Sequence, residues 1–253
     1  RQRQMCIRDR NGSHGPLDIS GAIEHSCNYF FYEVGYRLSR NNGVYDSDTG
    51  LEKLAYYADQ FGLSDKSGVE ISESAPKVSD FDAIRSAIGQ GTNNYSTVGL
   101  ARYVTTVANS GNCYNLSLLS KATDADGNLI ADYTPTLRNT VDLKQSTWDA
   151  IHQGMRKVVE DKDYYKDLTI QVAGKTGTAQ ENRKRANHAL FVCYAPYEQP
   201  QIAIATRIAF GYASDYAAQV TKDIVKYYFK LEDESSLITG TAESTNVVQS
   251  AGD

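Results

Sequence analysis

The stretch that decides the fold is Gln171-Val172-Ala173-Gly174-Lys175-Thr176-Gly177-Thr178-Ala179-Gln180. Its flanks alternate as a β-strand does, and glycine, which lacks a Cβ, lets another backbone or a ligand lie close at Gly174 and Gly177. Thr176 and Thr178 project from one face of such a strand, and Lys175 from the other. The side chains of Thr176, Thr178 and Lys175 can therefore contact the same ligand only if this strand lies at the edge of a sheet. The pattern therefore predicts a site for an anionic or peptide-like ligand, with hydroxyl, ammonium and backbone N–H donors.

The composition limits the classes of protein and partner. With 253 residues the chain can form one large domain or two small ones around a substantial core. A formal net charge of −5, with no basic tract beyond the first ten residues, argues against nucleic acid as a partner. The apolar runs, such as Ile202 to Ala205, are too short to cross a bilayer. The four cysteines lack metal-ligand spacing, and Cys27 and Cys193 fit apolar patterns as small buried residues. We expect no metal.

Both ends of the chain differ from its centre. Residues 1–10 carry four arginines and share no pattern with the rest of the chain. They resemble translated adapter sequence, so we treat them as a non-native segment and expect the protein to continue upstream. Residues 232–253 are rich in Ser, Thr and Glu with little periodicity, which predicts a disordered tail.

The hydrophobic pattern between these ends predicts helices, then strands, then a final helix. Helices are expected at 19–38, 51–61, 96–109, 148–160 and 215–229. Strands are expected at 116–122 and 128–133 around the favoured turn Asp126-Gly127, and then at the Lys175 stretch, 188–194 and 201–208. This order indicates an α/β fold of the α+β type, with an antiparallel sheet flanked by helices.

Two polar residues, Ser26 and Asn28, flank Cys27 inside the helix expected at 19–38. On an unbroken helix their side chains point about 200° apart, as solvent-facing residues of an amphipathic helix do. A kink between two shorter helices would instead bring the hydroxyl and the amide to one cleft. The sequence leaves both arrangements open.

A second pair, Ser74 and Lys77, has the spacing of a serine nucleophile and a lysine base. Pro76 breaks the helical turn that would put both side chains on one face. The polar connector at 64–80 therefore predicts a surface loop here, and we reject the pair as a catalytic site.

Several stretches in this order carry a family resemblance. They are Ser26-Cys27-Asn28, Gly89-Gln90-Gly91 before a helix, and Lys175-Thr176-Gly177-Thr178. Together they resemble the transpeptidase domain of penicillin-binding proteins. The longer stretches 86–91, 173–180 and 188–192 resemble the class B subgroup, in particular the elongation-type penicillin-binding protein 2. The similarity runs from about residue 19 to 229. It implies a β-lactamase/transpeptidase-like fold with an all-helical lobe, in which 11–231 is the C-terminal part of the domain.

The resemblance also implies roles for single residues. In the family a serine attacks the D-Ala-D-Ala end of a peptidoglycan stem peptide, and the acyl-enzyme is resolved by a neighbouring stem to form a cross-link. Ser26 would pass a proton, and Asn28 would hold the substrate amide and the catalytic lysine. Lys175 would supply positive potential, and the hydroxyls of Thr176 and Thr178 would bind the substrate carboxylate, with Gly177 between them in the substrate-binding stretch. The backbone N–H of Thr178 would form half of the oxyanion hole. β-Lactams would acylate the same site.

One motif of the family is absent from this sequence. The Ser-x-x-Lys pair with the nucleophile stands N-terminal to the position of Ser26 in the family. We expect this pair in the upstream part, so that the fragment alone forms no acyl-enzyme. Two other functions stay open: a serine β-lactamase, and a non-catalytic β-lactam sensor or scaffold of the same fold.

The resemblance further implies a cellular setting. The domain would lie on the outer face of the bacterial cytoplasmic membrane, anchored by an N-terminal helix outside this sequence. Its partners would be a glycosyltransferase of the shape-determining family and other elongation proteins. No cofactor is expected.

Overall fold

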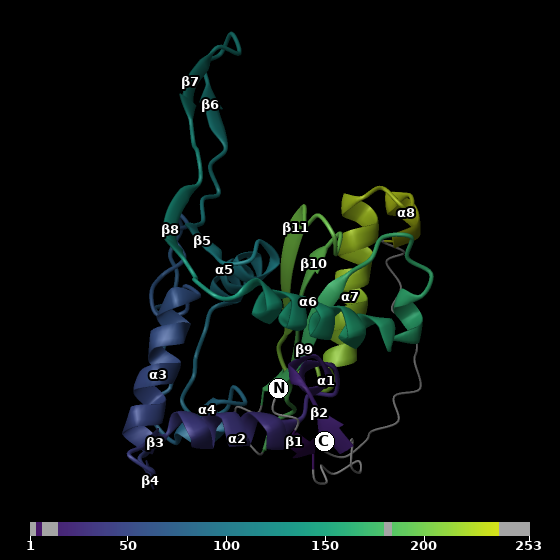
Figure 1. Ribbon diagram of the computed structural model, residues 1–253. Coiled ribbons are helices and arrows are strands. Elements are labelled where there is room, and N and C mark those ends of the chain that lie inside the picture. Colours follow the sequence, from purple (N-terminus) through teal and green to yellow (C-terminus); the bar gives the residue numbers. More distant parts are fainter. Residues whose placement is uncertain (1–3, 7–14, 180–183, 238–253) are drawn as a thin grey trace.

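The computed structural model describes residues 4–6, 15–179 and 184–237, so most of the segment 1–10 and of the expected tail lies outside it. Its centre is a three-stranded antiparallel sheet of β9 (Ala173–Ala179), β10 (His188–Ala195) and β11 (Ile202–Ile208) (Figure 1). The strand order is β11-β10-β9. Among the described residues β9 pairs only with β10 and forms an edge of the sheet, which confirms the position predicted for the Lys175 stretch.

Helices cover both faces of this sheet, as predicted. Alternate residues of β10 enter two hydrophobic clusters, because successive side chains of a strand point to opposite faces. Phe191 and Cys193 pack on the side of α7 (Ser214–Tyr228). Val192 and Tyr194 pack on the opposite side, with α5 (Thr97–Ala108) and α6 (Gln145–Glu160). The sheet is thus buried on both faces and open at the edge of β9.

The helical lobe is formed by α2 (Asn28–Leu38), α3 (Ser47–Gln60) and α4 (Ala83–Ser86), which contact one another. α3 starts four residues before the predicted start at 51. The Asp46 carboxylate caps it, accepting hydrogen bonds from the Asp48 N–H at 3.1 Å and the Thr49 hydroxyl at 2.5 Å. The lobe confirms the all-helical part expected from the sequence.

A short helix, α1 (Ile19–Glu24), is fastened to α6. The Ser20 hydroxyl donates a hydrogen bond to the Ala150 carbonyl at 2.8 Å. Gly154 makes the close approach possible, because a Cβ there would lie 2.8 Å from the Cβ of Ile23 and 2.9 Å from the Ser20 carbonyl oxygen. Since α6 also packs on β9, α1 is held at the open edge of the sheet.

The strand expected at 116–122 is wrong in its first half. Leu116 donates its N–H to the Ser67 carbonyl, and Leu118 donates to the Glu70 carboxylate, so this segment is bonded to the connector instead. The hairpin consists of β6 (Lys121–Thr123) and β7 (Leu129–Asp132), with the expected turn at Gly127 (φ +84°). It extends away from the rest of the molecule (Figure 1). Two strands not predicted, β5 (Asn112–Asn115) and β8 (Thr136–Thr140), pair at its base.

The described start of the expected tail contains a helical turn, and the rest of the tail predicted from residue 232 lies outside the described residues. α8 (Glu234–Leu237) forms one helical turn, in which the Ser236 N–H and hydroxyl both donate to the Asp233 carbonyl. The remaining elements are small. They are β1 (Gln4–Cys6) paired with β2 (Gly15–Leu17), β3 (Arg40–Asn41) paired with β4 (Val44–Tyr45), and the 3₁₀ turn η1 (Asp163–Tyr165). Within the described ranges no helix has the length and apolar character needed to cross a membrane.

Candidate active site

Ser26 lies in a break between two helices, one of the two arrangements that the sequence left open. α1 ends at Glu24, and α2 begins at Asn28. Between them Ser26 has a φ of +50°, in the left-handed region that costs a non-glycine residue about 1–3 kcal/mol. Cys27 closes the turn, because its N–H donates to the Ala22 carbonyl at 3.0 Å and its Sγ accepts from the Phe30 N–H at 3.4 Å. Of the two arrangements, the structure has the pair of shorter helices and not one unbroken helix over 19–38.

Lys175 reaches Ser26 from the edge strand. Its Nζ donates hydrogen bonds to the Ser26 hydroxyl and, at 3.0 Å, to the Thr176 carbonyl. Lys175 stands opposite Val192 in the register of β9 and β10, and therefore projects on the α6 side of the sheet, where α1 is fastened. The structure thus brings together two of the predicted catalytic residues, which are 149 positions apart in the sequence.

The ammonium of Lys175 is partly withdrawn from water. Burial, and after it the positive charge of Lys162, lower the pKa of Lys175 from 10.5 to about 8. Desolvation penalises the charged form of a lysine, and a neighbouring cation adds to that penalty. Lys175 can therefore exchange a proton with the Ser26 hydroxyl closer to neutral pH than an exposed lysine can.

The predicted substrate-binding residues continue along the same strand. Thr176 is half-buried and Thr178 is exposed, and both project on the face opposite Lys175. A Cβ at Gly177 would meet nothing closer than the Leu190 Cβ at 3.4 Å, an ordinary contact. Gly174 differs, because a Cβ there would lie 2.5 Å from the Phe191 ring. At Gly174 the missing Cβ therefore leaves room for the neighbouring strand, and not for a ligand.

Asn28 takes no part in the contact between Lys175 and Ser26. It is the first residue of α2, its side chain is exposed, and within the described ranges its amide makes no hydrogen bond. The structure therefore joins Ser26 to Lys175 and leaves Asn28 as an exposed amide two residues away. Its predicted role as a ligand for substrate and catalytic lysine stays a prediction.

A model of the penicillin binding protein transpeptidase domain matches residues 2–226 of the chain.

The chain belongs to this family. The family resemblance found in the sequence is thereby confirmed.

Its relatives are transpeptidases and penicillin-binding proteins. The peptidoglycan D,D-transpeptidase MrdA of Haemophilus influenzae is 28% identical over an alignment of 253 residues, which covers 85% of this chain and 37% of the relative. The structure of penicillin-binding protein 2B from Streptococcus pneumoniae has a TM-score of 0.77 at 25% identity, covering 89% of this chain and 41% of that one. Helicobacter pylori penicillin-binding protein 2, solved in complex with MreC, shares the fold at a TM-score of 0.65 and 22% identity, covering 87% of this chain and 42% of that one. The chain spans less than half the length of these proteins.

The rejected Ser74–Lys77 pair lies where the sequence placed it, on a surface loop of this transpeptidase domain. Both side chains are exposed, and the Lys77 Nζ pairs with Asp80 at 3.1 Å. The backbone of Lys77 bridges to Asn94 and not to the segment of Ser26. The pair takes no part in the site at β9.

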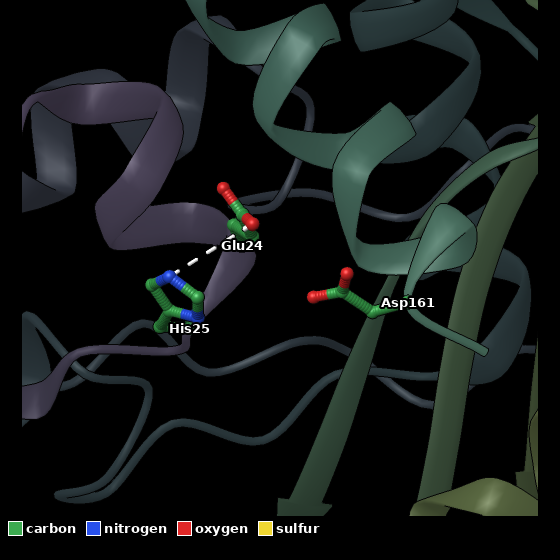
Figure 2. Close-up of side chains that lie close together, drawn as sticks. All are labelled: Glu24, His25 and Asp161. Atoms are coloured by element: carbon green, nitrogen blue, oxygen red, sulfur yellow. Dashed lines mark ion pairs between the residues drawn. The ribbon is translucent and has the colours of Figure 1, made fainter. Parts of the chain in front are cut away.

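A group of potential metal ligands lies beside Ser26. Glu24, His25 and Asp161 bring their ligand atoms within 4.8 Å of one another at the adjacent ends of α1 and α6 (Figure 2). Glu24 is already paired, with His25 at 3.8 Å and with Lys157 at 3.5 Å, and both His25 and Asp161 are exposed. Because a lysine already balances the carboxylate, we assign no ion to this group.

Three further residues near the site were missed from the sequence. Lys162 follows α6 and donates to the Asp215 carboxylate at 2.5 Å, and the Tyr164 hydroxyl donates to the same oxygen at 2.7 Å. The charged, tyrosine-bearing loop after α6 has no motif that marks these residues. Only the folded chain brings it to the first turn of α7.

Proposed function

We propose that this chain supplies the second and third motifs of a peptidoglycan D,D-transpeptidase, which cross-links stem peptides through a serine acyl-enzyme and is acylated by β-lactams. The observation that carries the proposal is the hydrogen bond from Lys175 to Ser26 across the open edge of β9. It places an ammonium and a hydroxyl on one site next to a strand edge on which a peptide can lie.

Each residue has a physical role in this proposal. Ser26 passes a proton between the attacking or leaving amine and the catalytic base, with Lys175 as its charged neighbour. The hydroxyls of Thr176 and Thr178 and the ammonium of Lys175 hold the terminal carboxylate of the stem peptide. The N–H of Thr178 stabilises the oxyanion, and Asn28 binds the substrate amide. Preorganised donors of this kind supply a large part of the rate enhancement in acyl transfer.

The setting of the reaction is part of the same proposal. The protein acts on the outer face of the cytoplasmic membrane, with a glycosyltransferase of the shape-determining family and other elongation proteins as partners. The family resemblance places the nucleophile at the serine of a Ser-x-x-Lys motif N-terminal to the position of Ser26.

The test is covalent labelling by a fluorescent penicillin of the full-length protein that contains this chain, with mass mapping of the labelled residue. We expect labelling at a serine of a Ser-x-x-Lys motif. Lys175→Ala should slow acylation about 10²- to 10³-fold, because one preorganised electrostatic contact is lost. Lys166→Ala, which removes an exposed lysine outside the site, serves as the matched control and should acylate at the normal rate. Absence of labelling at any serine would instead favour a sensor or scaffold.

A further inference from the structure

A stripe of tyrosines runs along the outer side of α2. Tyr29, Tyr32 and Tyr36 lie within about 60° of one another on an ideal helix. Tyr29 is 41% and Tyr36 is 39% exposed, and Tyr32 is half-buried. The inner side of α2 is different, because Phe30 and Val34 pack there in a hydrophobic cluster with α1. Exposed aromatic side chains gathered on one face mark a binding surface in many proteins.

Tyr45 of β4 lengthens this tyrosine stripe. Its ring is 43% exposed and stacks on the ring of Tyr36, with centroids 5.8 Å apart and planes 9° from parallel. Two helical turns, or roughly 10 Å, separate Tyr36 from Tyr29 along the axis of α2. No described residue forms a hydrogen bond with the hydroxyls of these tyrosines, which remain available to a ligand. The tyrosine stripe therefore suits an extended ligand that has polar groups as well as apolar faces.

The tyrosine stripe begins at the candidate active site. Asn28 is the first residue of α2 and is followed by Tyr29, and Ser26, which accepts the hydrogen bond of Lys175, lies just before the helix. From there α2 leads away towards β3 and the start of α3 (Figure 1). An extended ligand on the tyrosine stripe would therefore have one end beside the contact of Ser26 and Lys175.

The charges of α2 cancel, which narrows the chemistry of the ligand. Glu33 and Arg37 are the charged residues of α2, and they pair with each other at 2.7 Å. Nucleic acids and anionic lipids instead bind surfaces with an excess of positive charge. A sugar ring fits this surface, because its positively polarised C–H groups pack on the negative face of an aromatic ring. Its hydroxyls can exchange hydrogen bonds with the tyrosine hydroxyls.

We propose that the tyrosine stripe binds a saccharide chain. The identity of this chain rests on the proposed function, in which it is the glycan strand that carries the stem peptide. Held along α2, the strand brings its peptide to the candidate active site at the edge of β9. The tyrosine stripe thus selects a peptide attached to a glycan over a free peptide.

The experiment titrates glycan strands, freed of their stem peptides, into the isotope-labelled chain and follows the backbone NMR signals. We expect the signals of α2 and β4 to shift. Tyr29→Ser combined with Tyr36→Ser should weaken binding about tenfold or more, because two stacking rings are lost. Tyr29→Phe combined with Tyr36→Phe keeps the rings and should retain most of the affinity. Tyr227→Ser combined with Tyr228→Ser, which removes two exposed tyrosines of α7, is the matched control and should bind as the wild type does.

Three results would overturn the proposal. They are unchanged affinity in the Tyr29→Ser and Tyr36→Ser variant, an equal loss in the α7 control, and no binding by the wild type at millimolar concentrations of sugar. In the last case, a wild-type dimer that the same variant dissociates in sedimentation would assign the tyrosine stripe to a contact between two copies of the chain. If the combined variant does not fold, Tyr29→Ser and Tyr36→Ser are titrated singly and judged by the same criteria.

Penicillin labelling of the full-length protein separates this proposal from the proposed function. Glycan binding without labelling would uphold the saccharide site and reject the transpeptidase function. Labelling without glycan binding would uphold the transpeptidase function and reject the saccharide site.

Discussion

Lys175 makes the contact on which the proposed function depends at a cost in stability. The edge of β9 places its ammonium against the Ser26 hydroxyl, but burial there opposes the charge. Because the pKa in the folded chain is about 8 and the ordinary value is 10.5, the unfolded chain binds more protons between these two values. Stability contributed by this group therefore rises with pH across that window, and the cost of charging it is fully present below pH 8.

Lys175→Met should accordingly stabilise the chain at neutral pH. Methionine has a similar length and carries no charge, so we expect a gain of about 1 kcal/mol at pH 7, after allowance for the lost hydrogen bonds. The gain over wild type should shrink as the pH approaches 10.5, the ordinary lysine value, because the wild-type side chain is then neutral in the folded state. Urea unfolding of both proteins from pH 7 to 10.5 measures this difference. A gain that is absent at pH 7, or that grows with pH, contradicts a buried and destabilised ammonium.

Single residues differ in how far the sequence predicted them. Lys175 and Ser26 belong to short motifs whose residue types carry the chemistry, and the structure joins them. Lys162 and Asp215 belong to no motif, and their contact joins residues 53 positions apart that meet only in the folded chain. Asn28 shows the converse. Its place in a motif predicts a functional residue, but the motif does not determine which residues Asn28 contacts.

At the scale of elements, the two glycines of β9 have different surroundings. The sequence predicts close approach of a backbone or ligand at both Gly174 and Gly177. In the structure Gly174 lies under the Phe191 ring of β10, whereas Gly177 has room for a methyl group. Gly174 therefore serves the packing of the sheet, and Gly177 remains available to a ligand on the open edge.

This difference predicts unequal effects of the same substitution. Gly174→Ala should destabilise the chain by roughly 1–3 kcal/mol, because its Cβ would meet the Phe191 ring at 2.5 Å and the Val192 carbonyl oxygen at 2.8 Å. Gly177→Ala should stay within about 0.5 kcal/mol of wild type, since its nearest contact is 3.4 Å away. Chemical unfolding of the two variants is the measurement. Equal stability of both would mean that β9 and β10 are not packed as closely as their register implies.

The break between α1 and α2 was harder to predict from the sequence than the strands of the central sheet. The apolar spacing from Ile19 to Leu38 continues across the break, so periodicity alone favours one helix. The break depends on a sulfur cap at Cys27 and on a left-handed Ser26, and neither residue type is a strong signal for such a turn. Strands β9 to β11 could be predicted from the sequence. Each corresponds to a long stretch of residues that either alternates between apolar and other side chains or is continuously apolar. The three stretches also follow one another closely along the chain.

At the scale of the whole molecule, Arg102 fastens the helical lobe to the layer that covers the sheet. It lies on α5, is fully buried, and donates to the carbonyls of Gly62, Asp65 and Lys66 beyond the end of α3. It also pairs with the Asp65 carboxylate at 2.7 Å. Gly62 accommodates the guanidinium, because a Cβ there would lie 2.6 Å from its Nε. This fastening could not be predicted from the sequence, since an arginine on an otherwise apolar helix suggests exposure.

Removal of this guanidinium should loosen the lobe as a unit. Arg102→Met leaves several buried carbonyl oxygens without a donor, and each unsatisfied group costs about 1–3 kcal/mol, so we expect a loss of about 3 kcal/mol in total. Lysine at this position should not rescue it, because one ammonium cannot match the planar fork of donors. Arg85→Met, which removes an exposed arginine of α4, is the matched control and should change stability by less than about 0.5 kcal/mol. Hydrogen exchange would locate the effect, with faster exchange expected at residues 62–66 and in α3 but not in β10. If exchange rises equally in β10, the lobe and the sheet unfold together and Arg102 is not a separate fastening between them.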